Sequence, residues 1–313
     1  MKKLTILLIV PLLILSQEFE SNLPIISIHT GGNEILDENR IICDMGIINH
    51  DDKLNNLSDL FNNYNGKISI ELRGSSSQQL FPKKSYSFET QTLKGNNNNV
   101  SLLDLPKEND WILYGPYSDK TLIRNNLTYF LSREMGNYAP RSKYCELFIN
   151  DEYRGIYMLT EKIKRDKNRV NIKEVEDGDL TGGYIIKIDK LTDAPENASW
   201  CSSMTNFNND PICFQYHYPK ADEITIDQKT YIENYMNDIQ NSIEELSQNQ
   251  TNIELVENIE FTSFIDYLII SELSKNVDGY RLSTFLYKDS DENNGKLNMG
   301  PVWDYNLSFG RSK

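Results

Sequence analysis

The chain has 313 residues, a formal net charge of −14 at pH 7 and a hydrophobic content of 39%. That content, together with 11% aromatic residues, is typical of a folded globular protein and excludes a disordered chain. The negative charge argues against broad electrostatic binding to nucleic acid or to an anionic membrane surface. It is compatible with basic protein partners.

The N-terminus has the pattern of a secretory signal peptide. Lys2 and Lys3 precede an unbroken apolar run over residues 4–15, and polar residues follow from Ser16. This run is shorter than the about 20 residues that a membrane-spanning helix needs. We therefore expect a signal peptide over residues 1–16, an exported mature chain over residues 17–313, and no stable membrane insertion after cleavage.

The cysteines give one candidate disulfide. Cys201 and Cys213 bracket a polar, loop-like segment, and an exported protein meets conditions that permit disulfides. Their spacing is not that of a zinc site, which usually shows Cys-x2-Cys or a histidine partner. Cys201 and Cys213 are therefore the favoured pair, the sequence leaves open whether they are bonded, and we expect no structural zinc.

The first half of the chain consists mostly of predicted strands. Residues 67–72 and 84–88 alternate with the period of two that marks a half-buried strand. Residues 119–135 carry apolar side chains at helical spacing, and Gly136 supplies a stop. Further strands are expected at residues 25–28, 111–114, 145–149, 153–159 and 184–188, of which 145–149 and 153–159 form a hairpin.

The second half is more helical. Residues 230–246 and 259–273 have helical periodicity, and strands are expected at residues 284–287 and 297–302. The order predicts an α+β fold in two lobes: a β-rich N-terminal lobe over about residues 24–190 and a more helical C-terminal lobe over about residues 220–313.

One segment resembles a phosphate-binding loop. Phosphoryl transfer needs a small-residue loop over the phosphates, a lysine on a strand and two carboxylates. In Arg73-Gly74-Ser75-Ser76-Ser77, small residues such as Ser76 let backbone N–H groups approach phosphate, and Arg73 adds positive charge. An ordinary hairpin turn is the commoner origin of such a segment.

Lys84 is the candidate for the strand lysine. It shares a predicted strand face with Tyr86 and Phe88, so its ammonium group points inward, where lysine is uncommon unless it is paired or functional. The alternative is a lysine at a strand edge whose ammonium group reaches solvent. Glu161 ends an apolar strand, which fits a nucleotide-binding hinge or a plain hairpin exit, and it is a candidate partner of Lys84.

The strongest pattern for chemistry is a pair of aspartates near the C-terminus. Asp278 follows a predicted helix, and Asp304 follows the strand at residues 297–302. Two loop aspartates that flank a hairpin are arranged like a kinase catalytic loop and its metal-binding aspartate. The aromatics Tyr280, Trp303, Tyr305 and Phe309 around them are expected to be buried. Either aspartate alone is also explained as the cap of a turn, and the joint arrangement favours function.

With these residues in view, the chain resembles the spore coat protein H (CotH) kinase family from about residue 24 to its last residue. Each block is weak alone, and their fixed order is specific. The blocks are Arg73-Gly74-x-Ser76 with Pro82-Lys83-Lys84-Ser85-Tyr86, Trp111 through Asp119 to Arg124-Asn125, Tyr153-Arg154-Gly155-Ile156-Tyr157 with Glu161, Gly182-Gly183-Tyr184, and Asn276-Val277-Asp278-Gly279 with Pro301-Val302-Trp303-Asp304-Tyr305-Asn306-Leu307.

The resemblance implies an atypical secretory protein kinase that uses ATP with Mg²⁺ or Mn²⁺. Its protein substrates would be phosphorylated on Ser or Thr, and basic, Ser/Thr-rich proteins of a coat or surface fit the acidic charge. By position, Asp278 looks like the catalytic aspartate, Asp304 like the metal ligand and Lys84 like the phosphate-binding lysine. Arg73, Ser76 and Glu161 join the expected cofactor site, and Arg124 has no assigned role. Expected locations are the secretory pathway, the cell surface or, in a spore former, the spore coat.

Two departures keep other functions open. Ser283 stands where a second metal ligand, often Asn, is expected, and a hydroxyl binds magnesium more weakly than a carboxylate does. The chain also stops nine residues after Asp304, where proteins of this kind continue into further helices, so a C-terminally truncated fragment is one interpretation. A non-catalytic surface, adhesion or coat-assembly protein with a kinase-like fold is the alternative function, and AMP transfer is a third.

Overall fold

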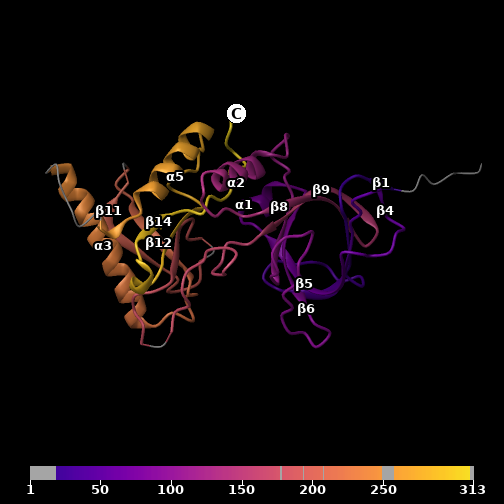
Figure 1. Ribbon diagram of the computed structural model, residues 1–313, viewed down its shortest axis with the longest axis horizontal. Coiled ribbons are helices and arrows are strands. Elements are labelled where there is room, and N and C mark those ends of the chain that lie inside the picture. Colours follow the sequence, from indigo (N-terminus) through magenta and orange to yellow (C-terminus); the bar gives the residue numbers. More distant parts are fainter. Residues whose placement is uncertain (1–18, 177, 193, 207, 249–256, 311–313) are drawn as a thin grey trace, which may run out of the picture.

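The computed structural model describes residues 19–310 except residues 177, 193, 207 and 249–256. The expected signal peptide at residues 1–16 lies outside the described residues. The observed fold is α+β, as predicted, and its two sheets occupy opposite sides of the molecule, with α2 between them (Figure 1). No helix among the described residues has the length and apolar character needed to span a bilayer.

The first sheet is a closed barrel, which the sequence did not predict. Its order is β2 (Ile25–His29), β3 (Ile41–Ile48), β5 (Tyr64–Arg73), β6 (Ser85–Gln91), β7 (Asp110–Tyr114), β9 (Glu152–Glu161) and β8 (Ser142–Ile149). All neighbours are antiparallel except β8 and β2, which pair in parallel and close the barrel. Closure removes both edges of the sheet, so every strand is paired on both sides.

The barrel interior accounts for the alternating pattern of its strands. Ile26 and Ile28 point inward on β2, as do Ile68 and Ile70 on β5, and Trp111 fills the centre with 0% exposure. Successive side chains on a strand face opposite sides, so these positions share one interior. A small ribbon of β1 (Glu20–Ser21) and β4 (Asn55–Asn56) accompanies the barrel.

The second sheet has five antiparallel strands. Its order is β11 (Ser199–Thr205), β12 (Pro211–Tyr218), β10 (Tyr184–Ile188), β13 (Thr284–Lys288) and β14 (Leu297–Met299). Residues near Cys201 and Cys213, expected to be loop-like, instead form the hairpin β11–β12. The favoured disulfide pair is confirmed, because these two cysteines are paired in the register and bonded.

Helix α3 (Ile226–Gln248) packs its apolar stripe on this second sheet, where Ile232 and Met236 meet Tyr184 and Leu286. Helix α5 (Phe261–Ser274) begins at Glu260, whose side chain accepts a hydrogen bond from the backbone of Thr262. The predicted helices at residues 230–246 and 259–273 are therefore present with shifted ends. A 3₁₀ turn, η1 (Asp291–Asn293), lies between β13 and β14.

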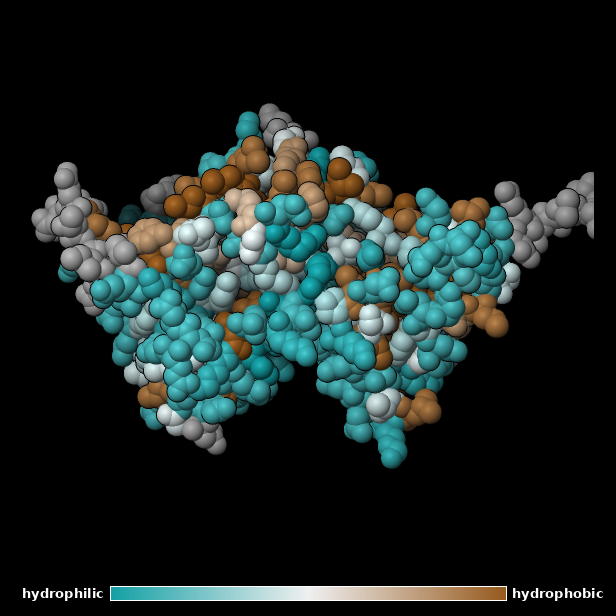
Figure 2. Space-filling model, in the orientation of Figure 1, coloured by the Kyte–Doolittle hydropathy of each residue, from teal (hydrophilic) through white to brown (hydrophobic). Residues whose placement is uncertain are grey.

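A third core joins the two halves. Helix α2 (Arg124–Glu134) contacts α5, and Tyr129 of α2 packs with Tyr267, Val302 and Tyr305. The segment after β14 therefore lies between the barrel and the helices of the second half. The opposite faces of α2 and α5 remain exposed, and apolar residues gather over them in Figure 2. Exposed members are Leu127, Phe130, Ile265, Leu268, Ile269 and Leu273.

Candidate active site

A large cleft lies where the end of β5, helix α2 and the hairpin β13–β14 meet. Its volume is about 740 Å³, which is within the usual size of ligand sites. Its wall includes five of the seven residues predicted to bind cofactor or metal or to catalyse transfer, and these come from both halves of the molecule. They are Arg73, Ser76, Asp278, Ser283 and Asp304.

Asp304 is held by a set of packed aromatic rings. Trp303 stacks on Tyr129 of α2 at 5.8 Å between ring centroids, and the buried Tyr305 shares a hydrogen bond of 2.9 Å with Ser271 of α5. Asp304 itself has a left-handed φ of 57°, a conformation that aspartate tolerates better than most residues. The aromatic residues therefore fix a strained loop whose carboxylate faces the cleft. Tyr280, expected to be buried with them, is 41% exposed.

Asp278 enters the cleft from the turn that follows α5. Lys275 ends the helix in a left-handed conformation, and the backbone N–H of Leu282 donates to the Asp278 carbonyl. The side chain is 23% exposed, and its Oδ1 accepts a hydrogen bond of 2.7 Å from Arg281. Ser283, which directly precedes β13 (Thr284–Lys288), has a left-handed φ of 50° and also lines the cleft.

The predicted phosphate loop forms one side of the cleft. Gly74 has a φ of +112°, a backbone conformation that favours glycine because other residues rarely adopt it. The following residues form the short helix α1 (Ser76–Leu80). Ser76 accepts a hydrogen bond of 2.8 Å from Lys190 at the end of β10. This bond links the barrel side of the cleft to the second sheet.

Both negatively and positively charged side chains influence Asp304. Burial, together with the negative charges of Asp278 and Asp189, raises the pKa of Asp304 from 3.8 to about 6. Arg73 and Lys190 offset part of this effect. The Arg73 guanidinium lies over the Trp303 ring at 5.7 Å, and its burial lowers its pKa against the opposing influence of Asp304.

Lys84 and Glu161 do not line the cleft. Lys84 immediately precedes β6, and its ammonium group donates to the carbonyls of Gln78 and Phe81 at 2.5 and 2.8 Å. It does not enter the barrel interior with Tyr86 and Phe88, as the alternation suggested, because β6 begins one residue later. The assignment of Lys84 to phosphate stays a prediction, and so does that of Glu161 to the cofactor.

Glu161 instead forms an ion pair with Arg141. Its side chain is 0% exposed and lies 2.8 Å from the Arg141 guanidinium, and its Oε2 accepts a hydrogen bond of 2.9 Å from the Arg141 backbone. Tyr138 also donates to this carboxylate. The expected partner, Lys84, is engaged elsewhere.

Charged residues of the cleft wall that were not predicted from the sequence include Lys187, Asp189 and Lys190. Lys187 and Asp189 form an ion pair of 3.4 Å at the end of β10. They occupy alternate positions at the end of an apolar strand, so period-two reading could have placed them on one face. Arg124, whose role was unassigned, pairs with the buried Asp119 at 2.5 Å and so helps to fix the start of α2.

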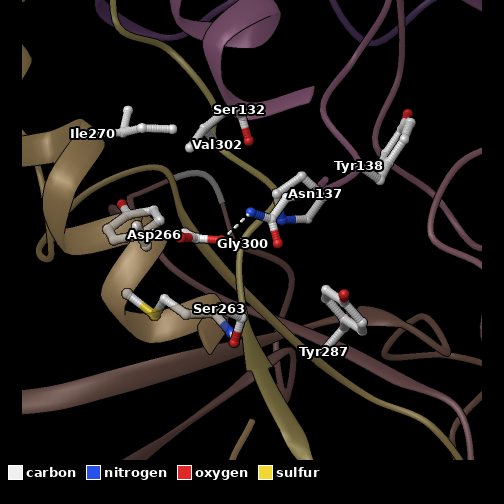
Figure 3. A pocket seen from close by; sticks show the side chains of 12 residues that line it. Ser132, Asn137, Tyr138, Ser263, Asp266, Ile270, Tyr287, Gly300 and Val302 are labelled. Carbon is white, nitrogen blue, oxygen red and sulfur yellow. Dashed lines mark hydrogen bonds between the residues drawn. The ribbon is translucent and has the colours of Figure 1, made fainter. Parts of the chain in front are cut away.

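A second hollow lies between α2, α5 and β14 (Figure 3). Its volume is about 10 Å³, which is room for about one water molecule. Asn137 donates a hydrogen bond of 2.7 Å to Asp266 across it. This hollow is a packing feature and does not compete with the large cleft as a ligand site.

Comparisons with known proteins point in one direction. The family model described as "CotH kinase protein" matches residues 70–313. The chain is also 22% identical over 250 residues to "Inner spore coat protein H" of Bacillus subtilis (strain 168), an alignment that covers 78% of this chain and 59% of that protein. The chain therefore spans less than two thirds of the length of this curated relative.

Proposed function

Because this chain belongs to the CotH kinase protein family, we propose that it is an exported protein kinase that transfers the γ-phosphate of ATP to Ser or Thr. One observation carries the proposal: Asp278 and Asp304, at the two ends of the β13–β14 region, line one cleft together with the Arg73–Ser77 loop. A two-lobed kinase-like arrangement, with the barrel half above the nucleotide and the second half below it, follows from the same proposal.

Asp278 is proposed to accept the proton of the substrate hydroxyl. The hydroxyl oxygen forms a bond to the γ-phosphorus, the bond from that phosphorus to the bridging oxygen breaks, and ADP leaves with the electron pair. Arg281 holds Oδ1 of Asp278 at 2.7 Å, which orients the carboxylate and leaves Oδ2 to receive the proton. Arg73 is proposed to neutralise phosphate charge.

The donor set of the cleft suits a divalent cation. Among the described residues, no three His, Cys, Asp or Glu side chains come together as a metal-binding group. Mg²⁺ is commonly held by one or two carboxylates together with substrate phosphates, and Asp304 with the Ser283 hydroxyl fits that pattern. When bound, Mg²⁺ or Mn²⁺ would neutralise negative charge on the phosphates.

The substrate and location follow from charge and relatedness. A chain with a net charge of −14 attracts basic polypeptides, so the proposed substrates are basic, Ser/Thr-rich proteins and not nucleic acid. The similarity to an inner spore coat protein supports a substrate in a coat or at a cell surface.

A non-catalytic coat-assembly or adhesion role is the second candidate. Asp278 is already engaged by Arg281, Ser283 stands where a stronger metal ligand is expected, and Lys84 contacts carbonyls of α1. These contacts would also be found in a kinase-like protein that has lost phosphate transfer.

Labelled ATP separates these functions. Purified protein is incubated with Mg²⁺ or Mn²⁺, a basic Ser/Thr-rich polypeptide and ATP labelled at either the γ- or the α-phosphate. We expect γ-label on the polypeptide with the wild type and none with Asp278→Ala or Asp304→Ala. Transfer of α-label would indicate AMP transfer. Absence of any label, with no rise in melting temperature on adding ATP and metal, would favour the non-catalytic role.

Two matched substitutions test which basic side chain, Arg73 or Lys84, binds the phosphates. Arg73→Met is expected to weaken ATP binding at least about tenfold, because it removes a charged group from the cleft wall. Lys84→Met is expected to change ATP affinity less than about twofold, because its ammonium group already binds two carbonyls. Isothermal titration gives both affinities. A larger loss in Lys84→Met would support the prediction that Lys84 is the phosphate-binding lysine.

A further inference from the structure

Asn125 is a buried polar residue of the cleft that has no partner in the protein. It lies in the first turn of α2, is only 6% exposed and lines the cleft. Its Oδ1 accepts no hydrogen bond, and no side-chain hydrogen bond of Asn125 is found within the described part of the chain. A buried amide without partners is costly, so an unsatisfied group at a cleft wall indicates a missing ligand.

The start of α2, which carries Asn125, and the loop of Asp304 line the same cleft and are joined through Tyr129. Tyr129 lies one turn after Asn125 on the same face of α2, and helical side chains lean toward the N-terminus, so the Tyr129 ring lies over the turn that carries Asn125. The Tyr129 hydroxyl accepts a hydrogen bond of 3.5 Å from the Asp304 backbone N–H. The start of α2 is fixed because Asp119 accepts from the Arg124 backbone at 2.9 Å.

The neighbouring asparagine shows that this position is unusual. Asn126, on the next position of α2, accepts a hydrogen bond of 2.9 Å from Ser142 on β8 and does not line the cleft. Two adjacent asparagines therefore have different surroundings, one bonded to the barrel and one facing the cleft without a bond. The helix start alone does not require an asparagine at position 125, because Asp119 already caps it.

We propose that Asn125 is a ligand of the divalent cation, which it shares with Asp304. This inference rests on the proposed function and adds a residue to it. Asp304 Oδ1 accepts a hydrogen bond of 2.5 Å from Asn306, and its other oxygen has no partner among the described residues. An amide oxygen and a carboxylate oxygen that both need a partner match a hard cation such as Mg²⁺ or Mn²⁺.

The carboxamide can present its oxygen without losing a contact. Oδ1 has almost no accessible surface, and a half turn about the Cβ–Cγ bond exchanges it with Nδ2. No hydrogen bond opposes that turn. An asparagine ligand is expected near position 283, where this chain has Ser283. Asn125 on α2 would supply the amide oxygen in its place.

The test measures Mn²⁺ binding directly. Free Mn²⁺ is followed by electron paramagnetic resonance during titration of the whole protein, with and without a non-hydrolysable ATP analogue. Asn125→Ala is expected to weaken Mn²⁺ binding at least about tenfold, and Asn125→Asp, which keeps an oxygen ligand, is expected to bind at least as tightly as the wild type. Asn126→Ala is the matched control and should bind Mn²⁺ as the wild type does.

Folding and nucleotide binding distinguish the outcomes. Without metal, Asn125→Ala should melt at or above the wild-type temperature, because it removes an unsatisfied group; a lower melting temperature with unchanged Mn²⁺ affinity would overturn the proposal. A loss of analogue binding without metal, with Mn²⁺ binding intact, would also overturn it and assign Asn125 to the nucleotide. If the wild type itself binds neither Mn²⁺ nor the analogue, the proposed kinase function fails and this inference fails with it.

Discussion

Asp304→Asn is expected to lower phosphate transfer strongly and, in metal-free buffer at pH 7, to make the protein more stable. Loss of the carboxylate removes the proposed metal ligand, and an electrostatic loss of this kind lowers transfer about 10²- to 10³-fold. The stability gain arises because burial and the charges of Asp278 and Asp189 raise the pKa of Asp304 to about 6. The folded protein therefore holds an unfavourable carboxylate at neutral pH.

The pH window follows from the sign of this shift. Between about pH 4 and 6 the folded chain keeps a proton on Asp304 that the unfolded chain has lost, so stability falls as pH rises through this range. A shift of about two pKa units corresponds to at most about 3 kcal/mol. Asp304→Asn should show that gain above pH 6 and lose it near pH 4.

His217 has the opposite effect in nearly the same range. Its burial lowers its pKa from 6.5 to about 4, so its contribution to stability rises with pH. Because wild type and Asp304→Asn both contain His217, the difference between their unfolding free energies isolates Asp304. Urea titrations in chelator from pH 4 to 8 measure this difference. A constant difference across the range would contradict the raised pKa.

Glu161→Ala is expected to lower the free energy of unfolding by about 1–3 kcal/mol, because the backbone N–H of Arg141 loses its buried acceptor, whereas the Arg141 side chain is 33% exposed and can be hydrated. Glu161 is 0% exposed, and its carboxylate accepts hydrogen bonds from both the backbone and the side chain of Arg141. The pair joins the end of β9 to the start of β8. Its loss should therefore loosen the barrel at the side that faces α2.

A surface pair provides the control for Glu161. Glu174 lies 3.0 Å from Arg165 but is 66% exposed, so Glu174→Ala should cost less than about 1 kcal/mol. Urea titration at pH 7.5 compares the two variants. A cost for Glu161→Ala as small as that of the control would mean that the buried pair contributes little. A loss of ATP affinity in a stably folded Glu161→Ala protein would instead support its predicted cofactor role.

Local sequence patterns predicted most elements of the second half. Residues 184–188 and 284–287 are strands, as their apolar β-branched and aromatic side chains indicated, and the two long helices lie where their periodicity placed them. These elements are set by contacts near in sequence and by one buried face. The hairpin β11–β12 was missed because its segment is rich in Ser and Asn. It is stabilised by the disulfide between its strands and by the pairing of β12 with β10.

Among the candidate site residues, the positions of the two loop aspartates were easier to predict from the sequence than that of Lys84. Asp278 and Asp304 follow recognisable elements, and both line the cleft. The alternation placed Tyr86 and Phe88 correctly in the barrel interior, but Lys84 precedes the strand, which begins at Ser85, so the alternation does not set its direction. Asn125 belonged to a recognised motif, but only its missing hydrogen bond gives it a chemical role.

The sequence by itself indicated the α+β class, favoured Cys201 and Cys213 as a disulfide pair without settling the bond, and singled out the two aspartates as candidates, because each depends on residue type and local periodicity. The tertiary structure decided the rest. Closure of the barrel by the parallel pair β2–β8 joins strands more than 100 residues apart. Packing of Tyr129 against Trp303 brings α2 to the loop of Asp304, so that Arg73, Asn125 and Asp304, from three distant segments, share one cleft. Contacts between such distant segments depend on how the two halves pack together, and a local sequence pattern does not contain that information.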